Sequence, residues 1–199
     1  MSYDQFGAKP VVLRCTRCGK FVDWEEARLQ VICSCKPRLD LPPVLVREGT
    51  DDDRAALREL FTRDFGRTRV VAFGEVMDID QMPMLVAVAS TDPSGALAYR
   101  LHGDALHIVA LATDPMWQRS GVGGHLVAEA ELLARRLGLT RLVVATTNDN
   151  LPALYFYQRR GYRLSALVVN SVSEHTKQEV PGFARIPVRD EVRLEKLIG

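Results

Sequence analysis

The sequence predicts a mixed α/β domain, in which helices flank a sheet, preceded by a small zinc-binding module. Three observations predict this arrangement. Apolar residues between positions 44 and 197 switch between strand-like and helical spacing in the order β-α-β-β-β-α-β-α-β-β. All four cysteines lie between residues 15 and 35. The stiff segment Leu41-Pro42-Pro43 follows them, so we place the module at 1–43 and the larger domain at 44–199.

The composition is that of a globular protein. Apolar residues make up 47% and charged residues 26% of the 199 positions, which excludes a disordered, collagen-like or coiled-coil chain. The net charge of +1 gives no bulk indication of nucleic-acid binding. No apolar run reaches the roughly 20 residues that span a bilayer, and the N-terminus lacks a signal-peptide pattern. We therefore expect a cytoplasmic protein with no membrane partner.

The N-terminal module carries a cysteine pattern typical of a structural zinc site. Cys15 and Cys18 form a C-x2-C pair, and Cys33 and Cys35 form a C-x-C pair after fourteen intervening residues. Two close pairs can supply the four thiolates of a tetrahedral Zn²⁺ site, which leaves no open position for catalysis. Four ordinary thiols are the alternative. The run 13–40 also resembles the accessory zinc ribbon of threonine-synthase-like proteins.

The first half of the larger domain is predicted to contain one helix and several strands. Thr50 and the three aspartates after it predict a helix start, because a hydroxyl can cap the first turn and acids suit its positive end. Gly66 ends that helix. A turn signal at residues 91–95 predicts a hairpin. Strands are predicted at residues 44–48, 84–90, 96–101 and 105–113, and residues 70–74 are predicted to form a strand or a strand-like loop.

The second half alternates between helices and strands. A long helix is predicted over 121–137, with apolar residues on one face and Gly138 as its cap. Residues 171–184 are polar and are predicted to form a loop. The remaining elements are predicted as a strand at 142–146, a helix at 151–160, a strand at 162–170 and a last strand at 186–197.

The segment Gln118–Gly124, QRSGVGG, joins the strand at 105–113 to the long helix. It places three glycines within four positions at a helix start, where free N–H groups and the positive end of the helix dipole attract anions. Arg119 adds a positive charge. The segment lacks the Gly-Lys-Ser/Thr ending of a P-loop and the third glycine of a dinucleotide fingerprint. It therefore predicts a phosphate or pyrophosphate site, with a plain packing turn as the alternative.

A second notable segment starts the helix predicted at 151–160. Asn150 can cap this helix, and Pro152 suits its first turn. Three aromatic residues follow at Tyr155, Phe156 and Tyr157. Core packing is the ordinary explanation for such a cluster.

Together the two segments resemble the GNAT superfamily of acyl-CoA-dependent N-acyltransferases. Gln118, Gly121 and Gly123 match its Gln/Arg-x-x-Gly-x-Gly/Ala loop. The later Asn-x-x-Ala-x-x-x-Tyr-x-x-x-Gly-Phe pattern is matched at Asn150, Ala153, Tyr157, Gly161 and, with Tyr for Phe, Tyr162. The element order matches as well, over about 44–197. The resemblance implies a mostly antiparallel sheet and acetyl-CoA as co-substrate.

The resemblance also implies roles for individual residues. Loop amides would bind the CoA pyrophosphate, and the end of the strand at 105–113 would bind the pantetheine arm and polarise the thioester carbonyl. Tyr157 would give a proton to the departing thiolate. The implied CoA-binding residues are Leu111, Ala112, Thr113, Gln118, Arg119, Ser120, Gly121, Val122, Gly123, Gly124, Asn150 and Tyr157.

The base that takes the proton of the amine is the least defined part of the site. His107 lies on the predicted central strand and has a suitable pKa range, so we name it as the catalytic base. Glu75 and Asp104 are weaker candidates. A core or groove histidine is the alternative, as is an amine that binds already neutral.

Three functions from different classes fit these observations. The first is acetyl transfer to a primary amine on a small molecule, a peptide N-terminus or a lysine. The second is a non-catalytic CoA-binding module that acts with a partner docked through the zinc ribbon. The third, a zinc-ribbon nucleic-acid binder, ranks last because acids interleave with the basic residues of the module. A homodimer is compatible with all three.

Overall fold

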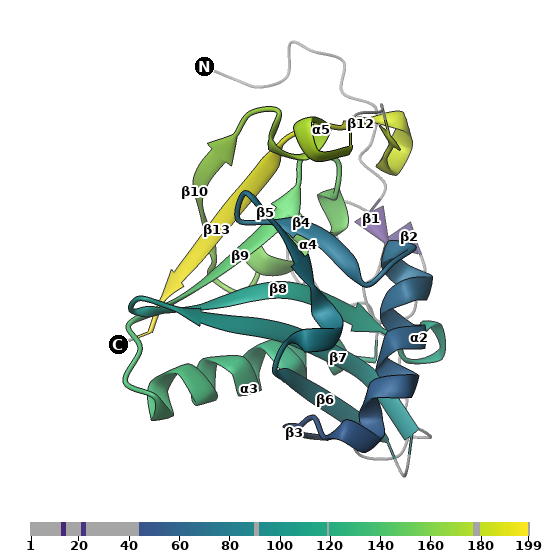
Figure 1. Ribbon diagram of the computed structural model, residues 1–199, viewed down its shortest axis with the longest axis vertical. Helices are drawn as coiled ribbons and strands as arrows, with labels where there is room; N and C mark the ends of the chain where they lie inside the picture. The colour runs from purple at the N-terminus through teal and green to yellow at the C-terminus, as the bar shows by residue number, and fades with distance from the viewer. Residues whose placement is uncertain are drawn as a thin grey trace.

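The protein is represented by a computed structural model, shown in Figure 1. It describes residues 13–14, 21–22, 44–89, 92–118, 120–176 and 180–198. Residues 13–14 and 21–22 form a short antiparallel pair, β1 (Leu13–Arg14) and β2 (Phe21–Val22). The four predicted zinc ligands, the proline connector and Arg119 lie outside the described residues. The zinc module and the boundary at residue 44 therefore stay predictions.

A seven-stranded sheet forms the centre of the protein, in the order β10-β13-β9-β8-β7-β6-β3. All neighbouring pairs in this sheet are antiparallel except β8 with β9. This confirms the predicted mixed, mostly antiparallel sheet. The strands are β3 (Val44–Glu48), β6 (Met84–Ala89), β7 (Asp92–His102), β8 (Ala105–Thr113), β9 (Arg141–Thr147), β10 (Arg163–Val168) and β13 (Glu191–Leu197).

Helices cover both faces of the sheet (Figure 1). The helices α3 (Val122–Arg136) and α4 (Leu151–Gln158) pack on one face, where Leu106 and Ile108 of β8 join their core. The helix α2 (Arg54–Phe65) packs on the other face, against Ala110 and Ala112 of the same strand. The first core is larger and includes Tyr157, whose side chain is therefore packed between the helices and the sheet.

The start of α2 confirms the sequence prediction at Thr50. Thr50 and Asp53 form a capping box around the short 3-10 turn Asp51–Asp53. Arg47 donates two hydrogen bonds to the Asp53 carboxylate, at 2.6 and 2.8 Å. These bonds, together with those from Thr50, hold the pKa of Asp53 well below its usual range despite its burial. The ion pair therefore fixes the end of β3 to the start of α2.

The two parallel strands separate partway along their length. β8 pairs with β9 only from Ala105–Arg141 to Ile108–Val144. At the same point the register of β8 against β7 shifts, which leaves Val109 as an extra residue. Beyond this bulge, none of the described strands pairs with the β8 edge that faces β9. The opening created there positions the candidate site.

Several parts of the fold differ from the sequence predictions. The strand or strand-like loop expected at 70–74 is a hairpin of β4 (Arg69–Ala72) and β5 (Glu75–Asp78), because the chain reverses at Phe73–Gly74 with φ of 57° and 75°. The polar loop expected at 171–184 contains the helix α5 (Ser171–Thr176) and the strand β11 (Val180–Pro181).

The last predicted strand is also two strands. β12 (Pro187–Val188) pairs with β11, and β13 starts at Glu191. The break occurs because the side-chain oxygen of Asn148 accepts the N–H groups of Arg189 and Asp190, at 2.9 and 3.0 Å. Among the described helices, none is long and apolar enough to cross a membrane.

Candidate functional site

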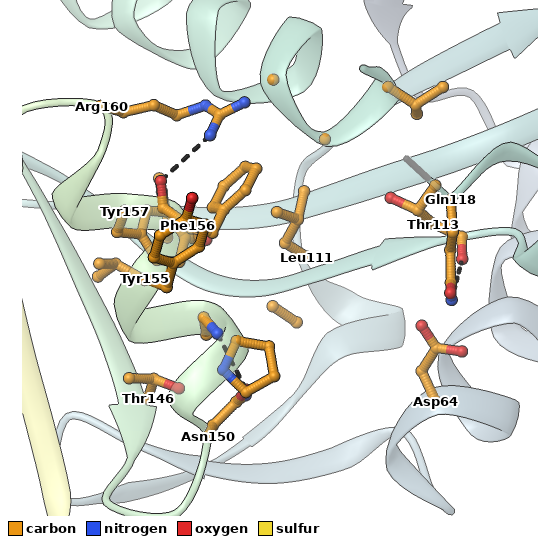
Figure 2. Close-up of a pocket in the computed structure, with 18 of the residues that line it drawn as sticks. Asp64, Leu111, Thr113, Gln118, Thr146, Asn150, Tyr155, Phe156, Tyr157 and Arg160 are labelled. Atoms are coloured by element: carbon orange, nitrogen blue, oxygen red, sulfur yellow. Dashed lines mark hydrogen bonds between the residues drawn. The ribbon is translucent and has the colours of Figure 1, made fainter. Parts of the chain in front are cut away.

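A pocket of about 1120 Å³ opens where β8 and β9 separate (Figure 2). Three elements form its walls: the turn before α3, the free edge of β8, and α4. Its volume is sufficient for a ligand the size of a large cofactor. The pocket therefore brings together the two segments that the sequence analysis singled out.

The glycine-rich turn forms one wall. Gly121 precedes α3 with φ of 100°, a conformation in which glycine is favoured, and the first helical hydrogen bond runs from His125 N–H to the Gly121 carbonyl. The amides of residues 122–124 therefore have no partner within the helix. Gly123 and Gly124 line the pocket without side chains to block it. This geometry provides a helix N-terminus that an anion can approach closely.

Two polar side chains of this turn form hydrogen bonds to nearby backbone carbonyl groups. The Gln118 amide donates to the Thr113 carbonyl at 3.4 Å, as Figure 2 shows. The Ser120 hydroxyl donates to the Trp117 carbonyl. Both residues line the pocket.

The free edge of β8 forms the floor. Leu111 and Thr113 line the pocket, whereas Ala112 points to the opposite face and is buried against α2. Of these three predicted CoA-binding residues, Ala112 can therefore contribute only its backbone. Unpaired backbone groups on a strand edge can bond an extended amide-bearing arm as a further strand would.

The helix α4 forms the third wall. The Asn150 side chain accepts the Ala153 N–H at 3.2 Å and so caps this helix, as predicted. Tyr157 is buried, and its ring packs edge-on against Phe156 and Tyr162 at 5.0 and 5.3 Å. Among the described residues, no group forms a hydrogen bond with the Tyr157 hydroxyl. Its oxygen is not fully buried. The hydroxyl is therefore free to meet a ligand.

Burial raises the pKa of Tyr157, and the nearby charge of Arg160 opposes the shift. The phenol is thus protonated at neutral pH. A protonated phenol at this position can donate a hydrogen bond, and then a proton, to a group that gains negative charge.

Several pocket residues were missed by sequence reasoning, among them the charged residues Asp64 and Arg160. Asp64, at the end of α2, lines the pocket near Thr113 (Figure 2). Burial raises the pKa of its carboxyl, partly offset by Arg63. Arg160 lines the opposite end, above the ring of Phe156. The spacing of four residues between Phe156 and Arg160 is the signal that could have revealed their contact.

The predicted base lies apart from this pocket. His107 belongs to β8 but is not among the pocket-lining residues, and its ring stacks on Phe73 of the β4–β5 hairpin at 4.1 Å. Burial, helped by the charge of Arg100, lowers the pKa of His107 to about 4. Its Nδ1 atom is buried and has no hydrogen-bond partner in the described structure. The base role of His107 stays a prediction.

The weaker candidates are also outside the pocket. Glu75 forms an ion pair with Arg100 at 3.0 Å. Asp104 accepts from Thr140 and Arg141, which lowers its pKa. Within the described ranges, no group of three or more His, Cys, Asp or Glu residues is arranged to hold a metal ion.

Comparison with known proteins agrees with this geometry. A sequence model described as the acetyltransferase (GNAT) family matches residues 51–162, which include the glycine-rich turn and α4. The chain belongs to the GNAT acetyltransferase family. Among its relatives, the uncharacterized protein YdhI of Bacillus subtilis (strain 168) is 31% identical over 147 residues, covering 71% of this chain and 91% of YdhI.

Two further comparisons extend this finding. The uncharacterized protein YxbD of the same organism is 41% identical over 106 residues, covering 51% of this chain and 65% of YxbD. A Bacillus subtilis acetyltransferase solved in complex with CoA superposes with a TM-score of 0.62 at 23% identity, over 80% of this chain and 99% of that chain. The structural likeness establishes the GNAT fold.

Proposed function

We propose that this protein transfers an acetyl group from acetyl-CoA to a primary amine. One observation carries the proposal: the free α3 amides, the unpaired β8 edge and the Tyr157 hydroxyl all face a single pocket. These are the three groups that an acyl-CoA donor needs for its phosphates, its pantetheine arm and its departing sulfur. The CoA complex of the structurally similar Bacillus subtilis acetyltransferase supports this choice of donor.

Different residues of the pocket have different roles in the reaction. The α3 amides hold the pyrophosphate, and the β8 edge aligns the arm and polarises the thioester carbonyl. The amine attacks the carbonyl carbon, the bond from carbon to sulfur breaks, and Tyr157 protonates the thiolate. The amine nitrogen loses one proton to solvent and Tyr157 regains one from solvent, so the products are the N-acetylated amine and CoA with a free thiol. No covalent link to the enzyme is needed.

Calorimetric titration with acetyl-CoA tests donor binding. A methyl group at Gly123 would lie 3.4 Å from the Phe156 ring, which is ordinary contact, whereas a larger side chain would enter the pocket. We expect the native protein and Gly123→Ala to bind acetyl-CoA at micromolar concentration and Gly123→Leu to lose binding. Absence of binding to the folded native protein would contradict the proposal.

A Tyr157→Phe variant separates the enzyme from a non-catalytic CoA-binding module. An enzyme that uses this acid loses turnover by about 10²- to 10³-fold but keeps its affinity for CoA. Turnover would be measured on a panel of small-molecule amines, peptide N-termini and lysines. Detectable CoA binding without turnover of any amine by the native protein would favour the module, with its partner docked through the N-terminal segment.

We further propose that Cys15, Cys18, Cys33 and Cys35 bind a structural Zn²⁺ ion. The grouping of all four cysteines within 21 positions supports the proposal. Metal analysis of reduced, zinc-replete protein is expected to give one zinc per chain, and about half or less in a Cys15→Ser/Cys18→Ser variant. Absence of zinc from the native protein would contradict it.

A further inference from the structure

A partly buried arginine lies against the first turn of α3. Arg160, just after the end of α4, reaches across to Gly124, and its Nη2 atom lies 2.6 Å from the position that a Cβ atom on Gly124 would occupy. Any side chain at position 124 would therefore displace the guanidinium. The absence of a side chain at Gly124 makes room for a positive charge beside the free amides of α3.

Two contacts hold the guanidinium in this place. Its central carbon lies 3.7 Å from the centroid of the Phe156 ring, and Nη1 donates to the Phe156 carbonyl oxygen at 3.1 Å. Figure 2 shows the group extended from α4 toward the glycine-rich turn. These two contacts use one face of the guanidinium and one of its nitrogens. Its other N–H groups take no part in them.

No carboxylate in the described part of the chain forms an ion pair with Arg160, although it lies in a partly desolvated position. The neighbouring Arg159 donates to the Tyr155 hydroxyl at 3.1 Å, and both of these residues also line the pocket. A half-buried guanidinium without a counterion is unfavourable, and the positive N-terminal end of α3 beside it adds to the cost. An anion that contacts both the guanidinium and this helix end removes the cost. Phosphate oxygens accept such planar donors especially well.

We propose that Arg160 binds the pyrophosphate of CoA together with the amides of residues 122–124. The inference rests on the proposed function, because it assigns a residue to the co-substrate of that reaction. Arg160 then acts as the phosphate ligand contributed by α4, the helix that also carries Tyr157. The bound pyrophosphate would thus contact both the amides of α3 and a residue next to α4, the helix that carries the acid Tyr157.

The test is calorimetric titration of the full chain with CoA, dephospho-CoA and pantetheine. We expect Arg160→Gln to weaken CoA and dephospho-CoA binding equally, by about 10- to 100-fold, since a charge-assisted hydrogen bond is lost. Pantetheine, which has no pyrophosphate, should bind both proteins alike. Arg163→Gln is the matched control: it removes the same charge three residues away, at an exposed position on β10 that does not line the pocket, and should change CoA affinity by less than about threefold.

Each other outcome has a definite meaning. Equal losses in the Arg163→Gln and Arg160→Gln variants would overturn the inference, because the effect would then be general charge attraction. If Arg160→Gln lost affinity for CoA but not for dephospho-CoA, the contact would lie at the 3′-phosphate, and this result would also overturn the inference. If the native protein binds no CoA, the proposed function fails instead. Should Arg160→Gln fold poorly, Phe156→Leu removes the stacking support and is expected to weaken both nucleotide ligands severalfold.

Discussion

At the scale of single residues, burial decides what two titratable groups can do. Tyr157 and His107 are both shielded from water, but burial acts in opposite directions on their pKa values because one group is an acid and the other a base. Both are therefore neutral at pH 7. Tyr157 presents a free hydroxyl to the pocket, whereas His107 faces Phe73 on the other side of the sheet.

The depressed pKa of His107 predicts acid sensitivity. The folded value of about 4 lies below the ordinary value of 6.5, so the unfolded chain binds the proton more tightly. Stability is then full above about pH 6.5 and falls as the pH drops toward 4; at pH 5 the loss is about 1–2 kcal/mol. Urea unfolding at pH 7 and pH 5 should show a smaller pH dependence for His107→Gln than for the native protein.

The same variant examines the base role. With His107 outside the pocket, His107→Gln is expected to retain amine turnover within about threefold at pH 8. Steady-state kinetics on any amine accepted by the native enzyme would measure this. A 100-fold fall in kcat with normal CoA affinity would instead support His107 as the base.

At the scale of secondary structure, α4 is a short helix that depends on its first turn. It has only eight residues, and its start is held by the bond from Ala153 N–H to the Asn150 side chain. Isolated helices of this length are marginal in water, so the cap and the packed aromatic residues maintain it. The position of Tyr157 and Arg160 follows from that start.

Removal of the cap should therefore be measurable. Asn150→Ala is expected to lower the free energy of unfolding by about 1 kcal/mol, since the Ala153 N–H loses its partner. Asn150→Asp keeps a side-chain oxygen in the same place and should stay within about 0.5 kcal/mol of the native protein. Urea denaturation at pH 7 measures both. Equal stability of the alanine variant and the native protein would show that the cap is dispensable.

At the scale of the whole molecule, one buried carboxylate joins distant parts of the chain. Glu191, at the start of β13, is 1% exposed. It accepts the Gly74 N–H at 3.3 Å and the Arg193 Nε–H at 2.6 Å. It thus ties the tip of the β4–β5 hairpin to the strand beside β9, over a sequence separation of 117 residues. The hairpin in turn covers His107 through Phe73.

Loss of this carboxylate should destabilise the protein as a unit. Glu191→Ala leaves Arg193 and Gly74 without their acceptor, and we expect a loss of about 2–4 kcal/mol. Glu191→Gln retains one acceptor oxygen and should lose roughly half as much. Thermal and urea unfolding would give these values. A loss below about 0.5 kcal/mol in Glu191→Ala would mean that water replaces the carboxylate without cost.

Local patterns predicted those elements whose signals lie close together in sequence. The capped start at Thr50, the Asn150 cap and the glycine-rich turn before α3 were each visible in a few residues. The β4–β5 hairpin was not, because it turns at Phe73, and an L-residue with φ of 57° has no recognisable turn signature. The helix α5 is only six residues long and lies in a polar segment that reads as a loop.

The sequence by itself determined the order of the strands of the main sheet and of α2, α3 and α4, the glycine-rich start of α3, and the family, since each depends on residues adjacent in the chain. Tertiary structure decided which residues face the pocket. The bulge at Val109 interrupts the alternation of β8, so strand periodicity could not show that His107 and Ala110 lie on the face away from α3. Likewise, only the packing of α4 on α3 brings Arg160 to Gly124, because contacts between distant segments leave no local pattern.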